Sequence, residues 1–150
     1  MLKIGDKMPY FEVVDQDGNK VTSDNLIGRK TVIYFYPKDN TSGCTAEACN
    51  LRDNYQSLEA QGYNVVGVSK DSAASHRKFA DKYELPFTLL SDTSTQMLQD
   101  FGAWGEKKMA GRNYMGIIRT TFIIDGCGTV EHVITKVNTK DAARQILELR

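Results

Sequence analysis

The chain has 150 residues and a mass of 16.8 kDa, the size of one ordinary domain that buries a core without a metal or disulfide scaffold. Its 41% apolar and 25% charged residues exclude a disordered tail, and no apolar run approaches the ~20 residues of a membrane-spanning helix. The 19 basic and 19 acidic residues balance, which argues against a nonspecific nucleic-acid binder and against binding to an anionic membrane. We expect one domain over residues 1–150 that acts on small, neutral partners.

Periodicity and turn chemistry predict an alternation of strands and helices. The first element is a hairpin, because residues 11–14 and 20–22 flank the turn sequence Asp15-Gln16-Asp17-Gly18. Residues 31–36 (TVIYFY) are apolar after Thr31, as in a parallel strand that is buried on both faces. The later elements are a helix over 44–60, a strand over 63–69, a helix over 73–83, a strand over 87–90, a short helix over 95–101, a hairpin of 119–124 and 130–136, and a helix over 139–149. This order predicts an α/β domain whose central mixed sheet is flanked by helices, parallel in the middle and antiparallel at one edge.

Between these elements, the glycine-rich and basic segment 102–116 lacks the order of residues found in a phosphate-binding loop. We expect a mobile loop here, anchored by Trp104, Met109, Tyr114 and Met115. An apolar wall beside a binding site is the alternative role for these side chains.

The N-terminal segment and the cysteines bear on the compartment. MLKIGDKMPYFEVVDQDG has no uninterrupted apolar core of signal-peptide length and carries acidic residues early, so we expect a cytoplasmic protein. Three cysteines, an odd number, then favour catalytic, redox or buried thiols over a structural disulfide framework.

The segment from Pro37 to Cys49 carries the chemistry. Cys44 falls in the first helical turn whether Thr41 or Ser42 is the N-cap, and there the free backbone N–H groups and the helix dipole favour a thiolate. Gly43 lets a ligand approach the backbone, Thr41 offers a hydroxyl one turn before the sulfur, and Pro37 stiffens the loop. The alternative is a small buried thiol at a helix start, because free cysteines are among the most buried residues.

Cys49 lies further along the same predicted helix. On an ideal helix the Cα atoms of Cys44 and Cys49 are ~8.6 Å apart. A disulfide tolerates at most ~7 Å, so the pair can bridge only if the helix unwinds locally. The spacing is poor for a static staple or a zinc site and suits a bond made transiently. A packed helix residue is the alternative for Cys49.

The two histidines are predicted to be surface or edge residues. His76 lies in a polar helical stretch and His132 in a strand, and the two are far apart in sequence without a nearby cysteine-rich motif. Metal ligation is therefore disfavoured, and no metal or cofactor is expected.

The motifs resemble a known family. Pro37, Thr41 and Cys44 fit the P-x-x-x-T/S-x-x-C signature of the peroxiredoxins. The run from Cys44 to Cys49 is similar to that of the bacterioferritin comigratory protein and PrxQ subfamily, and 105–108 (GEKK) with 113–122 (NYMGIIRTTF) resembles its second signature. The resemblance extends from about Gly5 to the final helix. It implies a thioredoxin-like fold and a thiol-specific peroxidase that reduces hydrogen peroxide and organic hydroperoxides to water and alcohols in antioxidant defence.

The resemblance also implies a role for each matching residue. Cys44 is the peroxidatic nucleophile, Thr41 and Arg119 activate it, Pro37 shields the pocket, and Cys49 is the resolving thiol of an intramolecular disulfide. An arginine suits the thiolate, the peroxide and the leaving oxygen, because it stays charged and offers several donors. A dithiol reductant, usually thioredoxin, would regenerate the pair, and the subfamily leans towards monomers.

Several points stay open at this level. Glu47, one turn after Cys44, suits the helix N-terminus and offers an ion pair that orients Arg119. Cys127 departs from the family pattern and is either an exposed turn thiol or a second resolving thiol. A redox-switched binding or chaperone-like protein on the same scaffold is the alternative function, and only a peroxidase would need Arg119. A thioredoxin-type disulfide reductase is disfavoured, because C-x4-C replaces C-x-x-C.

Overall fold

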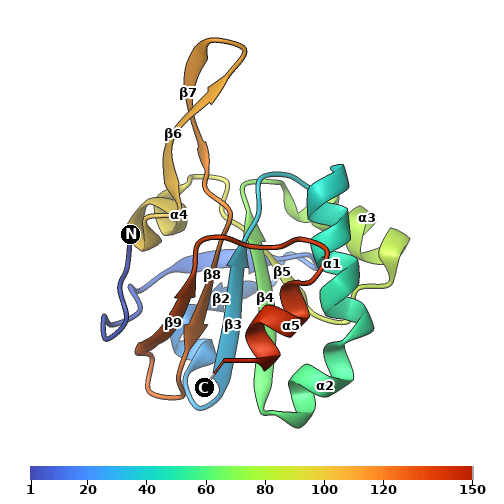
Figure 1. The fold of residues 1–150 in the computed structure, drawn as a ribbon, viewed down its shortest axis with the longest axis vertical. Helices are drawn as coiled ribbons and strands as arrows, with labels where there is room; N and C mark the ends of the chain where they lie inside the picture. The colour runs from blue at the N-terminus through green and yellow to red at the C-terminus, as the bar shows by residue number, and fades with distance from the viewer. Residues whose placement is uncertain (150) are drawn as a thin grey trace.

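The computed structural model describes residues 1–149, and its centre is a seven-stranded mixed sheet (Figure 1). Strands β3 (Lys30–Phe35), β4 (Tyr63–Ser69) and β5 (Thr88–Ser91) are parallel neighbours. Strand β8 (Thr120–Ile124) pairs antiparallel with β3, and β1 (Glu12–Asp15) pairs antiparallel with β5. The predicted mixed sheet is confirmed, but antiparallel pairing at only one edge is wrong. The N-terminal hairpin supplies the other edge, because its strand β1 satisfies the free backbone groups of β5. In spatial order the strands are β2 (Lys20–Thr22), β1 (Glu12–Asp15), β5 (Thr88–Ser91), β4 (Tyr63–Ser69), β3 (Lys30–Phe35), β8 (Thr120–Ile124) and β9 (Val130–Ile134).

Helices cover both faces of this sheet (Figure 1). Side chains of β3 alternate between two apolar clusters. Tyr34 packs on the side of α1 (Ser42–Asp53), α3 (Ala73–Tyr83) and α5 (Ala142–Leu147), and Phe35 packs on the side of α4 (Gln96–Phe101). This alternation explains why the strand sequence is apolar from Val32 onward. No helix within residues 1–149 is both long and apolar enough to cross a membrane. The helices are α1 (Ser42–Asp53), α2 (Tyr55–Ala60), α3 (Ala73–Tyr83), α4 (Gln96–Phe101), α5 (Ala142–Leu147) and a 3-10 turn over Ser23–Leu26.

The helix predicted over 44–60 is divided at Asn54. The backbone of Asn54 leaves the helical region (φ −110°, ψ 14°), and its side-chain Nδ2 donates to the Asn50 carbonyl at 2.9 Å. The backbone N–H of Asn54 also donates to the Asn50 carbonyl, at 3.2 Å, so the side chain adds a second bond to this carbonyl where α1 ends and the shorter α2 begins.

The loop predicted over 102–116 is instead a two-stranded antiparallel hairpin that projects from the body (Figure 1). Its strands are β6 (Trp104–Met109) and β7 (Arg112–Ile117). Ala110 and Gly111 both have positive φ, 51° and 78°, which is the backbone of a tight hairpin turn. Met109, Tyr114 and Met115 are exposed, so the predicted anchoring role is wrong for them, whereas Trp104 packs against the core.

Candidate active site

The register of β3 and β8 brings together segments that are distant in sequence. In this antiparallel pair Phe35 lies opposite Thr120, so Arg119 stands beside the chain where it leaves β3. That chain continues through residues 36–41 into α1, which begins at Ser42 and carries Cys44 in its first turn. Arg119 and the N-terminus of α1 therefore meet at one end of the sheet.

The Arg119 guanidinium bridges two side chains of α1. Its Nη2 donates to Cys44 Sγ at 3.3 Å, and its Nη1 donates to Glu47 Oε1 at 2.7 Å. Glu47 lies one helical turn after Cys44, so both face the same guanidinium. A Cβ at Gly43 would lie 3.4 Å from Arg119 Nη2, at the limit of ordinary van der Waals contact, so Arg119 packs closely over this residue. Arginine is suited to the bridge because its donors lie in one rigid plane.

Burial and neighbouring charges shift the pKa values of Glu47, Arg119 and Tyr34. Burial raises the pKa of Glu47 from 4.5 to about 7, although the Arg119 charge and its hydrogen bond act in the opposite direction. For Arg119, burial lowers the pKa, but the Glu47 carboxylate and the Cys44 sulfur outweigh it and the net shift is upward. Glu47 Oε2 and the Tyr34 hydroxyl are buried without a hydrogen-bond partner in the described part of the chain. Burial, followed by the Glu47 charge, raises the pKa of Tyr34 well above its ordinary value.

Thr41 and Pro37 lie on the loop that leads into α1. Thr41 is the N-cap of α1, but its side chain makes no capping bond; its hydroxyl donates to the Lys38 carbonyl at 2.9 Å. Because the proton is used there, the lone pairs of the Thr41 oxygen are left to accept a hydrogen bond. Thr41 is exposed and Pro37 half-buried, whereas Cys44 is buried below them.

The three cysteines occupy different settings and all are free. Cys49 is half-buried on the same helix as Cys44. Cys127 is exposed in the turn between β8 and β9, at the opposite end of β8 from Arg119. Its position separates Cys127 from the Cys44 sulfur and favours the interpretation as a turn thiol.

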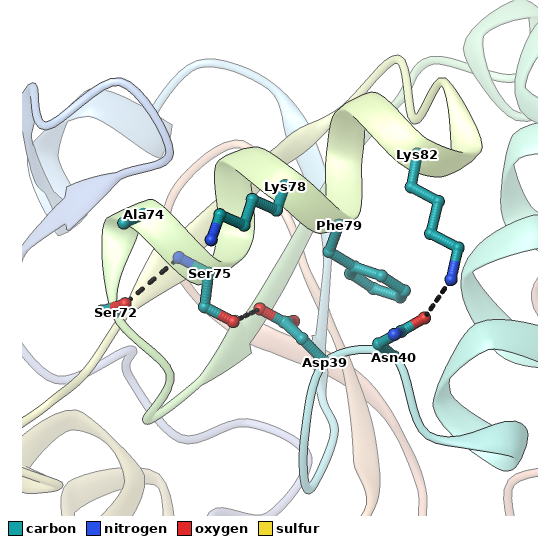
Figure 2. A pocket seen from close by; sticks show the side chains of 8 residues that line it. All are labelled: Asp39, Asn40, Ser72, Ala74, Ser75, Lys78, Phe79 and Lys82. Carbon is teal, nitrogen blue, oxygen red and sulfur yellow. Dashed lines mark hydrogen bonds between the residues drawn. The ribbon is translucent and has the colours of Figure 1, made fainter.

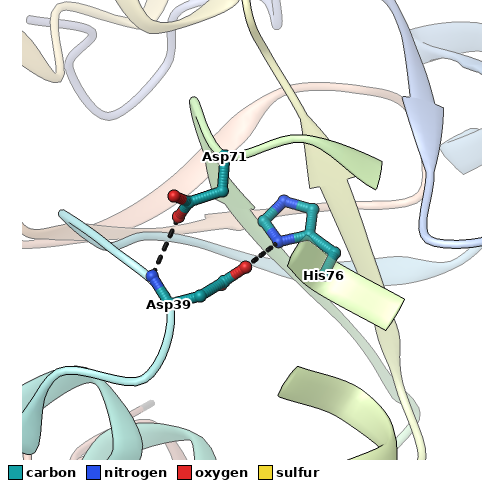
Figure 3. Close-up of side chains that lie close together, drawn as sticks. All are labelled: Asp39, Asp71 and His76. Atoms are coloured by element: carbon teal, nitrogen blue, oxygen red, sulfur yellow. Dashed lines mark hydrogen bonds and ion pairs between the residues drawn. The ribbon is translucent and has the colours of Figure 1, made fainter. Parts of the chain in front are cut away.

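His76 is fully buried, so its predicted surface position is wrong, while His132 is half-buried on β9. His76 lies on α3 at helical spacing from the buried Phe79 and Ala80, which is the sequence signal that was missed. Its Nδ1 is 2.7 Å from Asp39 Oδ2, in the loop before α1 (Figure 3). The potential ligand atoms of Asp39, Asp71 and His76 lie within 4.8 Å of one another. His76 and Asp39 already satisfy each other there by a hydrogen bond.

Comparison with known proteins identifies the family. The AhpC/TSA family model matches residues 4–133. The chain belongs to this family. Peroxiredoxin Bcp of Escherichia coli is 45% identical over 140 residues, which covers 93% of this chain and 90% of that protein. A putative peroxiredoxin of Coxiella burnetii is 41% identical over 146 residues, covering 97% of both.

Solved structures agree with this assignment. Peroxidoxin BcpB from Mycobacterium tuberculosis has a TM-score of 0.86 at 33% identity, over 98% of this chain and 95% of that one. Peroxiredoxin Q of Xanthomonas campestris also has a TM-score of 0.86, at 34% identity, over 91% and 87%. The predicted thioredoxin-like fold and subfamily are confirmed, and the chain is a thiol peroxidase whose substrates are peroxides and whose reductant is of the thioredoxin type.

Proposed function

We propose that Cys44 is the peroxidatic cysteine and that Arg119 activates it. The observation that carries this proposal is the hydrogen bond from Arg119 Nη2 to Cys44 Sγ at 3.3 Å, at the N-terminal turn of α1. The fixed guanidinium charge and the free N–H groups of that turn both stabilise a negative sulfur. Neither Cys49 nor Cys127 has a hydrogen bond from an arginine side chain to its sulfur within residues 1–149.

In the first step the Cys44 thiolate attacks one oxygen of the hydroperoxide. An S–O bond forms and the O–O bond breaks, so the sulfur is oxidised to sulfenic acid and the leaving oxygen departs as alkoxide or hydroxide, which takes a proton. Arg119 donors stabilise the charge that develops on that oxygen, and the free lone pairs of Thr41 accept the hydrogen of the peroxide. Pro37 and the loop restrict water near the sulfur.

In the second step Cys49 resolves the sulfenic acid. The Cys49 sulfur attacks the Cys44 sulfur, an S–S bond forms, and the S–O bond breaks with release of water. Since both residues belong to the regular helix α1, the helix unwinds between them to bring the Cα atoms within about 7 Å. Asn50 and Arg52, which tie this part of α1 to the Lys140 and Tyr83 carbonyls, are the contacts that unwinding strains.

A thioredoxin would then reduce the Cys44–Cys49 disulfide by thiol–disulfide exchange, and both thiols return to the free state. We place the enzyme in the cytoplasm as a monomer, because a reducing compartment keeps its free thiols ready and the chemistry proposed here uses one chain. Gel filtration coupled to light scattering tests the monomer, and cell fractionation tests the compartment.

The decisive experiment adds one equivalent of hydrogen peroxide to the fully reduced protein, counts free thiols and maps the disulfide by peptide mass. We expect a rapid fall from the three free thiols to one, with Cys44 bonded to Cys49. Cys44→Ser should not react rapidly. Loss of no thiol in the parent protein would contradict the proposed activation of Cys44.

Two further variants separate the roles of the other cysteines. Cys49→Ser should react once and stop at the Cys44 sulfenic acid, which a dimedone adduct traps. Cys127→Ser is the matched control and should turn over with thioredoxin at the parental rate. Full turnover by Cys49→Ser would show that Cys49 is not the resolving thiol.

A further inference from the structure

The loop that carries Pro37 and Thr41 is held by a buried polar network on its other side. Asp39, in the middle of the loop, is only 7% exposed. Its Oδ1 accepts from the Tyr36 hydroxyl at 2.6 Å, and its Oδ2 accepts from Ser75 Oγ at 2.8 Å. His76 Nδ1 is the third neighbour of this carboxylate, at 2.7 Å. One loop side chain is therefore hydrogen-bonded both to Tyr36, the residue that follows β3, and to α3.

The hydrogen bonds of His76 determine where its protons are. Nε2 lies 2.9 Å from the Leu90 carbonyl oxygen, which only accepts, so Nε2 carries a hydrogen. A second hydrogen lies between Nδ1 and Asp39 Oδ2, because atoms 2.7 Å apart in this geometry share a hydrogen bond. Both side chains are buried, at 0% and 4% exposure, so each depends on the other for this bond.

A single peptide group links this network to Thr41. The N–H of Asp39 donates to Asp71 Oδ2 at 2.8 Å (Figure 3). The carbonyl on the other side of the same planar peptide belongs to Lys38, and it accepts the Thr41 hydroxyl at 2.9 Å. Because the peptide is planar, fixing its N–H fixes the direction of its C=O. The orientation of the Thr41 hydroxyl is therefore set from the far side of the loop.

Tyr36 holds the start of the loop in the apolar core, whereas the middle of the loop borders a pocket. A pocket of about 380 Å³ lies between the loop and α3, lined by Asp39, Asn40, Ser75 and Phe79 among others (Figure 2). Asn40 has a left-handed backbone (φ 61°), and its Oδ1 accepts from Lys82 Nζ at 3.2 Å and from the Tyr83 hydroxyl at 3.1 Å. Beyond Tyr36, polar bonds beside this pocket connect the loop to α3.

From this geometry we propose that Asp39, Asp71 and His76 are positioning residues that orient the Lys38–Asp39 peptide and through it the Thr41 hydroxyl, so that Thr41 accepts the hydrogen of the peroxide. The inference rests on the proposed roles of Cys44 and Thr41. It assigns a function to a network that touches neither the sulfur nor Arg119.

The test compares two reactions of Cys44 in Asp39→Ala and Asp39→Asn. Oxidation by hydrogen peroxide needs Thr41, whereas alkylation by iodoacetamide reports only the thiolate at α1. In Asp39→Ala we expect the peroxide rate constant to fall at least about tenfold, as misplaced groups commonly cost this much. The alkylation rate and its pH profile should stay parental, because α1 and Arg119 keep their contacts.

Asp39→Asn is the conservative rescue. The amide NH2 takes the place of Oδ2 and donates to His76 Nδ1 and Ser75 Oγ, and the amide oxygen still accepts from Tyr36, so the tether persists. We expect a peroxide rate constant within about threefold of the parent, far above that of the alanine variant. Asp81→Ala, an exposed aspartate of α3, is the matched control and should change neither reaction.

The other possible results either overturn this inference or overturn the proposed function of Cys44. An Asp39→Ala protein that is folded and oxidised at the parental rate overturns the inference, and so does an equal loss in both reactions. If Asp39→Ala does not fold by circular dichroism, Asp71→Ala removes the peptide anchor and is judged by the same two rates, with Asp71→Asn as its rescue. Should the parent itself react no faster with peroxide than an ordinary thiol, the proposed function fails, which is a different result from a failure of positioning.

Discussion

The segment that joins β3 to α1 lies near two sets of buried polar groups that differ in how many of their atoms have hydrogen-bond partners. On the α3 side, each oxygen of Asp39 and each ring nitrogen of His76 has a hydrogen-bond partner. On the β8 side, Glu47 Oε2 and the Tyr34 hydroxyl have no partner among residues 1–149, and burial raises the pKa of Glu47 to about 7. The network of Asp39 and His76 makes all its hydrogen bonds, whereas the groups without a partner lie on the side of Cys44 and Arg119.

This difference shows where the fold tolerates buried polar groups that have no hydrogen-bond partner. A buried polar group without a partner destabilises the folded state, so its presence beside Cys44 is consistent with a functional demand there. The network of Asp39 and His76 is under no such demand, and all its polar groups are hydrogen-bonded. Three measurements test the difference between the groups beside Cys44 and the network of Asp39 and His76. They follow in decreasing order of expected effect.

Arg119→Met should have the largest effect. It removes the donor to Cys44 Sγ and the partner of Glu47 together, and loss of one such donor commonly lowers a rate by about 10²–10³-fold. Stopped-flow oxidation by hydrogen peroxide measures the loss. Arg119→Lys should fall between parent and Met, because a lysine keeps the charge but not the planar pair of donors. Arg112→Met, in the exposed hairpin, is the control, and an equal effect there would contradict the assignment.

Glu47→Gln should change how stability depends on pH. The folded pKa of Glu47 is about 7 and its ordinary value is 4.5, so the folded state retains the proton longer than the unfolded state. The parent therefore loses stability as pH rises from 4.5 through 7, by roughly 3 kcal/mol relative to the variant, and the difference is constant outside this window. Urea unfolding of both proteins at several pH values measures it. A pH-independent difference between them would contradict the raised pKa.

The smallest effect comes from a matched pair of substitutions on one strand face. Tyr34 and Tyr36 stack with ring centroids 5.3 Å apart, yet only Tyr36 has a hydrogen-bond partner for its hydroxyl, the Asp39 carboxylate. Tyr36→Phe should reduce the free energy of unfolding by roughly 2 kcal/mol, because a bond to a charged group is lost. Tyr34→Phe should leave it unchanged or raise it. A larger loss in Tyr34→Phe would reverse the comparison.

Local patterns predicted most of the elements. The buried run at 31–36, the helix over 73–83 and the strand over 63–69 all correspond to observed elements, since their periodicity is a property of neighbouring residues. The failures are cases in which a local signal was weak or ambiguous. The β6–β7 hairpin has a turn of Ala110 and Gly111 rather than a common Asn-Gly pair, and the break at Asn54 is a departure of one residue from the helical backbone.

In the candidate site, too, some residues could be predicted from their neighbours in the sequence and others could not. Cys44 at the start of a helix, with Thr41 and Gly43 before it, follows from adjacent residues, and the helix start itself favours the thiolate. The place of His76 does not follow so directly, because a histidine among polar neighbours is ordinarily exposed. Its burial depends on Asp39 and on the Leu90 carbonyl, which belong to other elements.

By itself, then, the sequence determined the alternation of strands and helices, the thiol at the N-terminus of α1 and the motif that identifies the family. The tertiary structure decided that Arg119 meets Cys44 and Glu47, that Glu47 is buried enough to titrate near neutral pH, and that Asp39 is locked to His76. These features differ in how far apart in the sequence the interacting residues lie. Helix starts and strand periodicity depend on residues a few positions apart, whereas the Arg119 contact needs the antiparallel register of β3 with β8, and burial needs the whole core to be assembled.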